Sequence, residues 1–184
     1  MLGIHDELEE LAKAVQRKNR ADAEIARIIG RPALIGHTGE YIAAIIFNIK
    51  LRRSAASKGI DGCFVGGDLA KKTVNIKWYS KMEGVLDITP EAIPDFYLVM
   101  AGPRGAATSS RGTTRPWLIS HVFLFDGREL ITELESLGVK IGIATSVRKY
   151  LWEMAEIYPT QRNNQLVVSE EQRRLLSLFG KSSD

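Results

Sequence analysis

Four polar residues in the first half of the chain have the types and spacing needed for phosphodiester chemistry. Asp61 begins one apolar segment, Asn75 and Lys77 alternate with apolar residues in a later one, and Glu40 begins an apolar helical pattern. Hydrolysis of a phosphodiester assisted by a Mg²⁺-type ion needs hard oxygen ligands and a cation near the attacking water or the phosphate. Asp61 and the backbone carbonyl of Ile76 would supply oxygens, and Lys77 would stabilise the developing charge.

A predicted β-hairpin over residues 58–81 places three of these residues together. Apolar β-forming residues lie on both sides of Gly66-Gly67, a pattern typical of two antiparallel strands with a short connection. Because side chains alternate along a strand, the second strand has two different faces. The polar face carries Thr73, Asn75 and Lys77, and the apolar face carries Val74, Ile76 and Trp78. The side chains of Asn75 and Lys77, about 6.6 Å apart along the strand, would then project beside Asp61.

Each of these residues also has a purely structural interpretation. Asp61 and Lys77 would form a buried salt bridge in the hairpin, although such pairs are costly to desolvate. Glu40 would lie in the first turn of a buried helix that Thr38 caps, where the helix dipole favours a carboxylate without any chemistry. A buried ion pair does not need a third charge from a helix beside it, so the three together favour a site.

Basic residues concentrate around the predicted hairpin. The net charge of the 184-residue chain is only +3, but residues 41–82 hold eight bases and two acids. The segment 102–116 carries three arginines, no acid and many small hydroxyl residues, as mobile loops do. Such a field suits nucleic acid, although a solvated basic face and a plain flexible insertion give the same patterns. The candidate nucleic-acid contacts are Lys58, Lys71, Lys72, Lys81, Arg104, Arg111 and Arg115.

The remaining pattern predicts a helical segment at residues 1–30 and a single domain over residues 31–184. An apolar stripe (Ile4, Leu8, Leu11 and Val15) resumes at Ile25 after a polar stretch, so Asn19 or Asp22 would restart a second helix that Gly30 closes. Further strands are expected at 95–101 and 117–125. Further helices are expected at 128–137, at 146–157 with Ser146 as its cap, and at 169–179 with a capping box at Ser169.

Several function classes lack their signatures. No apolar run is long enough to span a bilayer, and the acidic residues near the start do not suit a signal peptide. We therefore expect a cytoplasmic protein with no membrane partner. One cysteine, Cys63, cannot form an internal disulfide, and the three histidines lack zinc-site spacing. No P-loop or dinucleotide fingerprint is present.

The order of a helix glutamate, Lys58-Gly59-Ile60-Asp61, a variable turn and Asn75-Ile76-Lys77 resembles the PD-(D/E)xK nuclease superfamily over roughly residues 34–101. Many restriction, repair and recombination nucleases belong to it. The resemblance implies an α/β (α+β) fold with a restriction-endonuclease-like core, a central mixed sheet flanked by helices. It also implies Mg²⁺ or Mn²⁺ held by Asp61, Glu40 and the Ile76 carbonyl, with Lys77 as the catalytic lysine.

The chain departs from the superfamily pattern at two places. Gly59-Ile60 stand where a proline often precedes the aspartate, and Asn75 stands where the second motif has an acid. An amide brings an oxygen but no charge; some members use glutamine there and remain active. Either Glu40 compensates as a ligand, or the site is degenerate and the protein only binds nucleic acid.

Three functions follow as expectations. The first is a Mg²⁺-dependent endonuclease acting on DNA in restriction or repair, with Asp61, Asn75, Lys77 and Glu40 as its catalytic residues. The second is a non-catalytic nucleic-acid-binding protein on a degenerate nuclease fold, and the third is a subunit of a larger assembly. A double-strand cut by this enzyme class needs two active sites, which makes a homodimer an expectation, although no residue indicates one.

Overall fold

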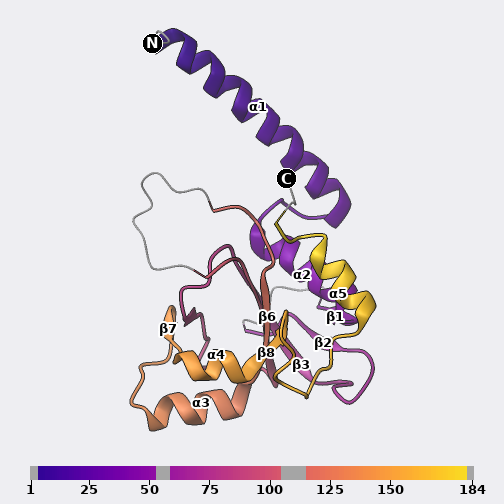
Figure 1. The fold of residues 1–184 in the computed structure, drawn as a ribbon, viewed down its shortest axis with the longest axis vertical. Coiled ribbons are helices and arrows are strands. Elements are labelled where there is room, and N and C mark those ends of the chain that lie inside the picture. Colours follow the sequence, from indigo (N-terminus) through magenta and orange to yellow (C-terminus); the bar gives the residue numbers. More distant parts are fainter. Residues whose placement is uncertain (1–3, 53–58, 105–114, 182–184) are drawn as a thin grey trace.

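A mixed six-stranded β-sheet forms the centre of the molecule, with the strand order β1-β2-β3-β5-β6-β8 (Figure 1). The structure is a computed structural model that describes residues 4–52, 59–104 and 115–181. The strands of this sheet are β1 (Ile49–Leu51), β2 (Gly62–Phe64), β3 (Thr73–Tyr79), β5 (Phe96–Ala101), β6 (His121–Asp126) and β8 (Glu156–Tyr158). A separate two-stranded sheet pairs β4 (Val85–Leu86) with β7 (Thr145–Ser146). The helices are α1 (Ile4–Ile29), α2 (Ile35–Ile46), α3 (Gly127–Ser136), α4 (Lys149–Ala155) and α5 (Glu170–Ser177).

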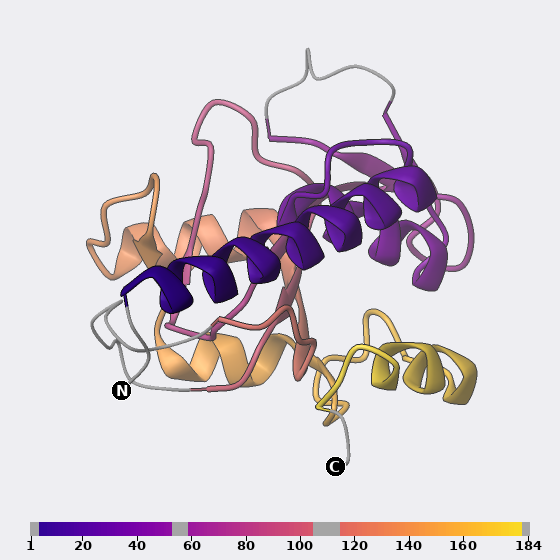
Figure 2. The same ribbon diagram turned by 90° about the horizontal axis from the view of Figure 1, so that it is seen from above.

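Helices cover both faces of the sheet. One core cluster joins α2 and α5 to the face that carries Val74, Ile76 and Trp78. The other cluster joins α3 and α4 to the opposite face, through residues such as Tyr97 and Phe123. Seen from above, α3 and α4 lie on the left of the molecule, and α2 and α5 lie on the right (Figure 2). The expectation of a central mixed sheet flanked by helices is therefore confirmed.

The predicted pairing of the strands around Asp61 is also confirmed. β2 pairs antiparallel with β3, whereas β3 pairs parallel with β5, which makes the sheet mixed. The side chains of β3 alternate as expected, since Val74 and Trp78 are buried under α2. The connection from β2 to β3 is longer than a two-residue turn: Phe64 ends β2, and Lys71 adopts a φ of 69° before β3 begins at Thr73.

Four predicted helix boundaries are wrong. α1 runs without a break through Asn19 and Asp22. α2 begins at Ile35, so Thr38 lies inside the helix instead of capping it, and its backbone N–H already donates to the Leu34 carbonyl. Packing of Ile35 on the core outweighs the missing side-chain cap.

The other two wrong boundaries are the start and the end of the helix predicted at 146–157. Ser146 pairs with Val85 in the small sheet instead of capping a helix, and α4 starts only at Lys149. The expected helix through Ile157 ends at Ala155, because Ile157 is fully buried within strand β8 at the sheet edge. The capping box at Ser169 is confirmed: its hydroxyl accepts from the Gln172 N–H at the start of α5.

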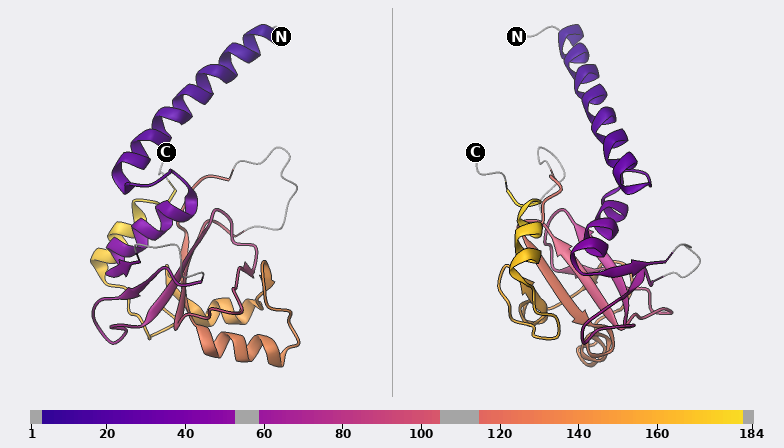
Figure 3. Two further views of the ribbon diagram at one scale, coloured as in Figure 1. Left: turned by 180° about the vertical axis from the view of Figure 1, so that it is seen from behind. Right: turned by 90° about the vertical axis from the view of Figure 1, so that its right-hand side faces the viewer.

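The long helix α1 projects from the body of the molecule (Figure 3). Its C-terminal end lies against α2 and α5, where Ile25 and Ile29 line an apolar groove together with Leu175 and Phe179. Gly30, with a φ of 69°, ends the helix in the left-handed conformation that glycine adopts readily. No helix in the described part of the chain combines the length and the apolar character needed to cross a membrane.

A glycine sets the distance between α2 and β3. A Cβ atom added to the buried Gly39 would lie 2.9 Å from the Trp78 Cβ and 3.3 Å from the Met100 Cε. Only a residue without a side chain lets α2 pack this closely on the sheet. The next residue on the helix is Glu40, so this contact also fixes where its carboxylate lies relative to β3.

Substitution of the two glycines of α2 tests this close contact. Gly39→Ala should lower the free energy of unfolding by about 1–3 kcal/mol, because the new methyl group overpacks the contact with Trp78. Gly36→Ala is the matched control: a Cβ there meets nothing within 4 Å. Its higher helix propensity should raise the stability by up to about 1 kcal/mol. Equal shifts for the two variants in urea unfolding would contradict the packing argument.

Candidate functional site

The Asp61 carboxylate lies at an open edge of strand β3. The ladder between β2 and β3 ends at the pair Gly62 and Val74, and the Asp61 N–H donates to the Val74 carbonyl at 2.9 Å. Beyond that pair, the Ile76 N–H has no strand partner and instead donates to Asp61 Oδ2 at 2.6 Å. A side chain thus continues the ladder where the strand pairing stops.

The same edge exposes a backbone oxygen to Asp61. In an extended strand the N–H and C=O of one residue point to the same side. Because the Ile76 N–H reaches Asp61, its C=O also points to this edge, while Asn75 and Lys77 direct their backbone groups toward β5. Strand geometry therefore directs the Ile76 carbonyl to the same open edge at which Asp61 lies.

Glu40 approaches Asp61 from helix α2 and carries its own counter-ion. Its Oε2 accepts a hydrogen bond from Arg31 Nη1 at 2.5 Å, and the Glu40 side chain is 20% exposed. Arg31 was not among the residues predicted from the sequence. It lies in the turn after α1, nine residues before Glu40, and no local pattern links the two; only the fold brings this turn to the start of α2.

The electrostatics of Asp61 show that these charges act on one another. Burial raises the pKa of Asp61 above its ordinary value, and the nearby charge of Glu40 raises it further. The hydrogen bond from Ile76 and the positive charges of Lys77 and Arg31 oppose this rise without cancelling it. The carboxylate is therefore costly to ionise as it stands, and an additional cation beside it would be favoured.

Lys77 and Asn75 lie on the face of β3 opposite to α2. Lys77 is partly exposed, and Asn75 is 4% exposed. The Asn75 Oδ1 is buried and accepts no hydrogen bond from the described residues. Its neighbour across the parallel ladder, Tyr97, also has a buried hydroxyl without a partner there, and burial raises the Tyr97 pKa to about 12. Unpaired buried oxygens are rare, so each calls for a cation, a donor or a bound water.

The region around Asp61 offers a divalent metal ion only a few protein ligands. Among the described residues, no three histidine, cysteine, aspartate or glutamate side chains lie close enough to hold a metal. Asp61 and Glu40 bring two carboxylates, and the Ile76 carbonyl at the strand edge brings a neutral oxygen. Mg²⁺ accepts such a set because it takes only oxygen ligands and usually keeps several waters. The donors present fit Mg²⁺ or Mn²⁺ and do not resemble a zinc site.

The predicted nucleic-acid contacts fall at the two ends of β3. Lys71 and Lys72 are exposed just before the strand, and Lys72 pairs with Asp95 at 3.3 Å. Beyond the other end, Lys81 and Arg115 both approach Glu83, at 3.7 Å and 3.3 Å. A carboxylate beside these bases reduces the local positive charge.

Of the three remaining predicted contacts, the structure describes only one. Arg104 is exposed and forms an isolated bridge with Met82. Lys58 and Arg111 lie outside the described residues. The flexible segment expected at 102–116 is likewise described only at its two ends, up to 104 and from 115.

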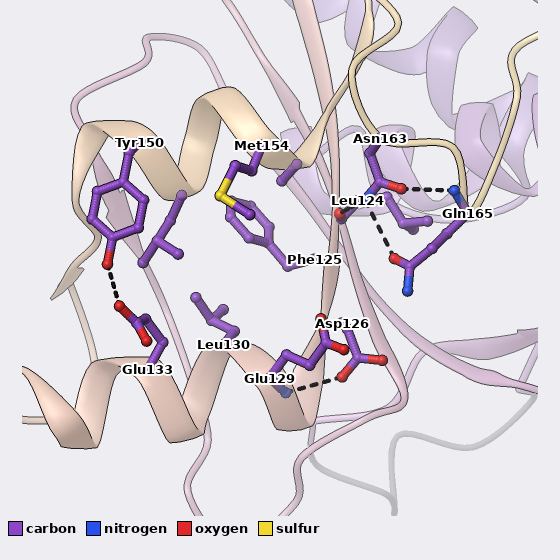
Figure 4. A pocket seen from close by; sticks show the side chains of 12 residues that line it. Leu124, Phe125, Asp126, Glu129, Leu130, Glu133, Tyr150, Met154, Asn163 and Gln165 are labelled. Atoms are coloured by element: carbon purple, nitrogen blue, oxygen red, sulfur yellow. Dashed lines mark hydrogen bonds between the residues drawn. The ribbon is translucent and has the colours of Figure 1, made fainter.

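A pocket of about 420 Å³ between α3, α4 and β6 is the main alternative location for a site (Figure 4). Most of its polar groups already have structural roles. Asp126 accepts hydrogen bonds from the first N–H groups of α3, Glu133 accepts one from the Tyr150 hydroxyl, and Asn163 donates to the Leu124 carbonyl. The pocket lies two strands away from β3 and contains none of the predicted catalytic residues.

No protein-family model matches this chain, and a search of curated proteins finds no match either. The class that the fold defines is thus a mixed α/β protein with helices on both faces of its sheet. Its function has to be argued from the side chains around Asp61.

Replacement of Asp61 by asparagine tests the electrostatics of the site. Because the pKa of Asp61 is raised in the folded state, ionisation of this group opposes folding, and stability falls as the pH rises from 3.8 through the folded pKa. Asp61→Asn should therefore melt at a higher temperature than the wild type at neutral pH, and the gain should vanish in acid.

Asp95→Asn is the control, because the pKa of Asp95 is shifted in the opposite direction to that of Asp61. Burial raises the Asp95 pKa, but hydrogen bonds from Thr73 and the charge of Lys72 lower it by more. Asp95 thus contributes stability above pH 3.8 that is lost as the pH falls through its folded pKa, so its asparagine variant should melt lower at neutral pH. A neutral-pH loss of stability in Asp61→Asn would show that the Asp61 charge is satisfied within the fold.

Proposed function

We propose that this protein is a Mg²⁺-dependent endonuclease of the PD-(D/E)xK type that hydrolyses phosphodiester bonds in DNA. The observation that carries the proposal is the Asp61 carboxylate, which is held at the open edge of β3 with a raised pKa, within reach of the charges of Glu40 and Lys77. Perturbed carboxylates with defined charged neighbours are typical of functional sites. The mixed sheet with α2 packed beside β3 supports it as well.

Each residue has a distinct role in this proposal. Asp61 and the Ile76 carbonyl would hold the ion at the strand edge, and Glu40 would complete the set from α2, with Arg31 orienting its carboxylate. The ion would supply polarisation of the phosphate and neutralisation of its charge. Lys77 would orient the attacking water and stabilise negative charge as it develops on the phosphate. Asn75 would offer its unpaired oxygen from the interior of β3.

The proposed substrate is DNA, in restriction or repair. The basic residues at the two ends of β3 flank Asp61 along the strand, a separation of about 20 Å between Thr73 and Tyr79. Lys71 and Arg104 would contact phosphates on either side of the scissile bond. The salt bridges of Lys72, Lys81 and Arg115 would exchange carboxylate for phosphate on binding.

A second candidate is a nucleic-acid-binding protein on the same fold without catalysis. Two observations favour it. Asn75 lacks the charge of an acid at a position that is almost fully buried, and Arg31 already neutralises Glu40. A site with one free carboxylate would bind a divalent ion weakly. Under this reading the fold would keep its DNA contacts and lose its chemistry.

A plasmid-nicking assay with variants of the site separates the candidates. Wild-type protein should cleave in Mg²⁺ or Mn²⁺ and not in a chelator. Asp61→Ala and Lys77→Ala should each lower the rate by about 10²–10⁴-fold, because both act on the charge of the transition state. Lys140→Ala removes the same charge from an exposed position after α3 and should leave the rate unchanged. Cleavage that persists in both site variants would exclude this site, and DNA binding without cleavage would favour the second candidate.

Replacement of Asn75 by aspartate tests whether the amide belongs to a working site. A new carboxylate at this almost fully buried position adds a charge where the Asn75 Oδ1 has no hydrogen-bond donor among the described residues. The cleavage rate should therefore fall by about tenfold or more. Asn75→Ser keeps a neutral oxygen and should retain more activity than Asn75→Asp. Cleavage that appears only in the aspartate variant would mean that the natural site is degenerate.

A further inference from the structure

Ile143, in the turn between α3 and β7, is 90% exposed, more than any other large apolar residue in the described part of the chain. Other apolar side chains of the same segment are packed: Val139 and Ile141 lie against the core cluster on the α3 and α4 face. The segment therefore has a core within reach. Of its three large apolar side chains, only that of Ile143 is turned into solvent.

Hydrogen bonds fix the backbone on both sides of Ile143. The Thr145 hydroxyl donates to the Gly142 carbonyl at 2.7 Å and accepts from the Gly142 N–H at 2.8 Å. Ala144 adopts a φ of 55°, which residues with a side chain rarely take, and its N–H donates to Asp87 Oδ1 at 2.7 Å. A turn bonded in this way holds the isoleucine in one outward direction, so little further entropy is lost when a partner binds it.

The connection between β4 and β5 links this turn to the segment that carries Asp61. At one end the Ile88 N–H donates to the Gly142 carbonyl at 3.0 Å. At the other end a Cβ added to Gly59 would lie 2.6 Å from the Ala92 carbonyl oxygen. These contacts and the length of the chain between them put the turn at most about 35 Å from Asp61, one turn of B-DNA. Figure 2 shows the turn (light orange, upper left) beside this connection (pink).

A basic cleft of about 330 Å³ lies at the other end of the small sheet. Arg104 and Lys149 line it together with residues that flank β4 and β7, and both bases are exposed. Two carboxylates are near: Glu153 pairs with Lys149 at 3.4 Å, and Glu83 pairs with two further bases. The bases around the cleft thus outnumber its acids, as at a surface that contacts phosphates.

We propose that the β4–β7 arm, residues 84–88 and 139–147, holds duplex DNA: Arg104 and Lys149 contact phosphates beside it, and Ile143 inserts at a base-pair step. The proposal rests on the proposed DNA substrate and adds how the duplex is held. An apolar side chain that enters a step partly unstacks the two base pairs and bends the duplex. Unstacking is easiest at pyrimidine–purine steps such as TA, so the arm would favour sites that contain one.

The size of the apolar tip selects DNA over a protein or a membrane. Gly142 and Ala144 flank Ile143 and add almost no apolar surface. A stable protein interface buries about 800 Å² on each partner, and anchoring to a membrane also needs a large apolar area. A base-pair step accepts one side chain, and the charge of the adjacent cleft complements the phosphates that flank the step.

The insertion is tested with the full chain and a duplex of about 30 base pairs that carries 2-aminopurine at a central TA step, in a chelator so that no cleavage is needed. The wild type should raise the 2-aminopurine fluorescence, because unstacking relieves its quenching. Ile143→Ser should abolish this rise and weaken binding by about threefold to tenfold. Val167→Ser is the matched control: it removes a 65% exposed apolar side chain beside the core cluster of the opposite sheet face, and should change neither readout.

The phosphate contact is tested by the salt dependence of binding. Lys149→Ala should lower the slope of log affinity against log salt by about one, because one phosphate contact is lost. Arg174→Ala also removes one positive charge and one ion pair within a helix, with Glu171 of α5, and should leave the slope unchanged.

Three results would overturn the proposal. They are a wild type that binds the duplex without a rise in fluorescence, an Ile143→Ser variant that keeps the rise, and a Lys149→Ala variant with an unchanged salt slope. Binding to phosphatidylglycerol vesicles that Ile143→Ser loses, with DNA binding unchanged, would assign the tip to a membrane and overturn it as well. Plasmid nicking reports the proposed function separately: unstacking without cleavage supports the arm on a non-catalytic protein, whereas cleavage without unstacking overturns the arm alone.

Discussion

The hydrogen bond from the Ile76 N–H to the Asp61 carboxylate is the contact on which the candidate site depends. It forms where the pairing of β2 with β3 stops. The Asp61 side chain accepts the hydrogen bond of the Ile76 N–H, which a longer β2 strand would otherwise accept through its backbone. The contact fixes the carboxylate at the strand edge to which the Ile76 carbonyl also points. Burial and Glu40 then make ionisation of this carboxylate unfavourable, so the fold holds Asp61 at an energetic cost that a cation would relieve.

The other parts of the fold serve this edge from two sides. Gly39 lets α2 approach Trp78 closely and so brings Glu40 to the site from one face of the sheet. The alternation of β3 directs Lys77 to the other face. Asp61 lies between the two faces, which explains how it responds to charges from both.

The sequence predicted the local features of the site because they depend on short-range periodicity. The antiparallel β2 and β3 pairing and the two faces of β3 follow from alternation, and both are confirmed. The salt bridge of Arg31 with Glu40 could not be predicted, since it joins a turn to a helix through tertiary packing. The prediction of Thr38 as a helix cap is wrong for the same reason. Packing of Ile35 against the core starts α2 three residues before Thr38, the residue that local sequence favours as its cap. The helix predicted through Ile157 is wrong for the same reason. Residues 156–158 form strand β8 because they pair with residues of β6 that lie more than 30 residues earlier in the chain.

The central claim is that Asp61 and its neighbours hold one divalent cation, and binding of Mn²⁺ followed by electron paramagnetic resonance tests it most directly. The account predicts that the wild type binds one ion per chain, that Asp61→Asn loses this binding, and that Lys77→Ala retains it, because Lys77 acts on the phosphate and not on the ion. Binding that survives in Asp61→Asn, or a wild type that binds no ion at all, would contradict the account.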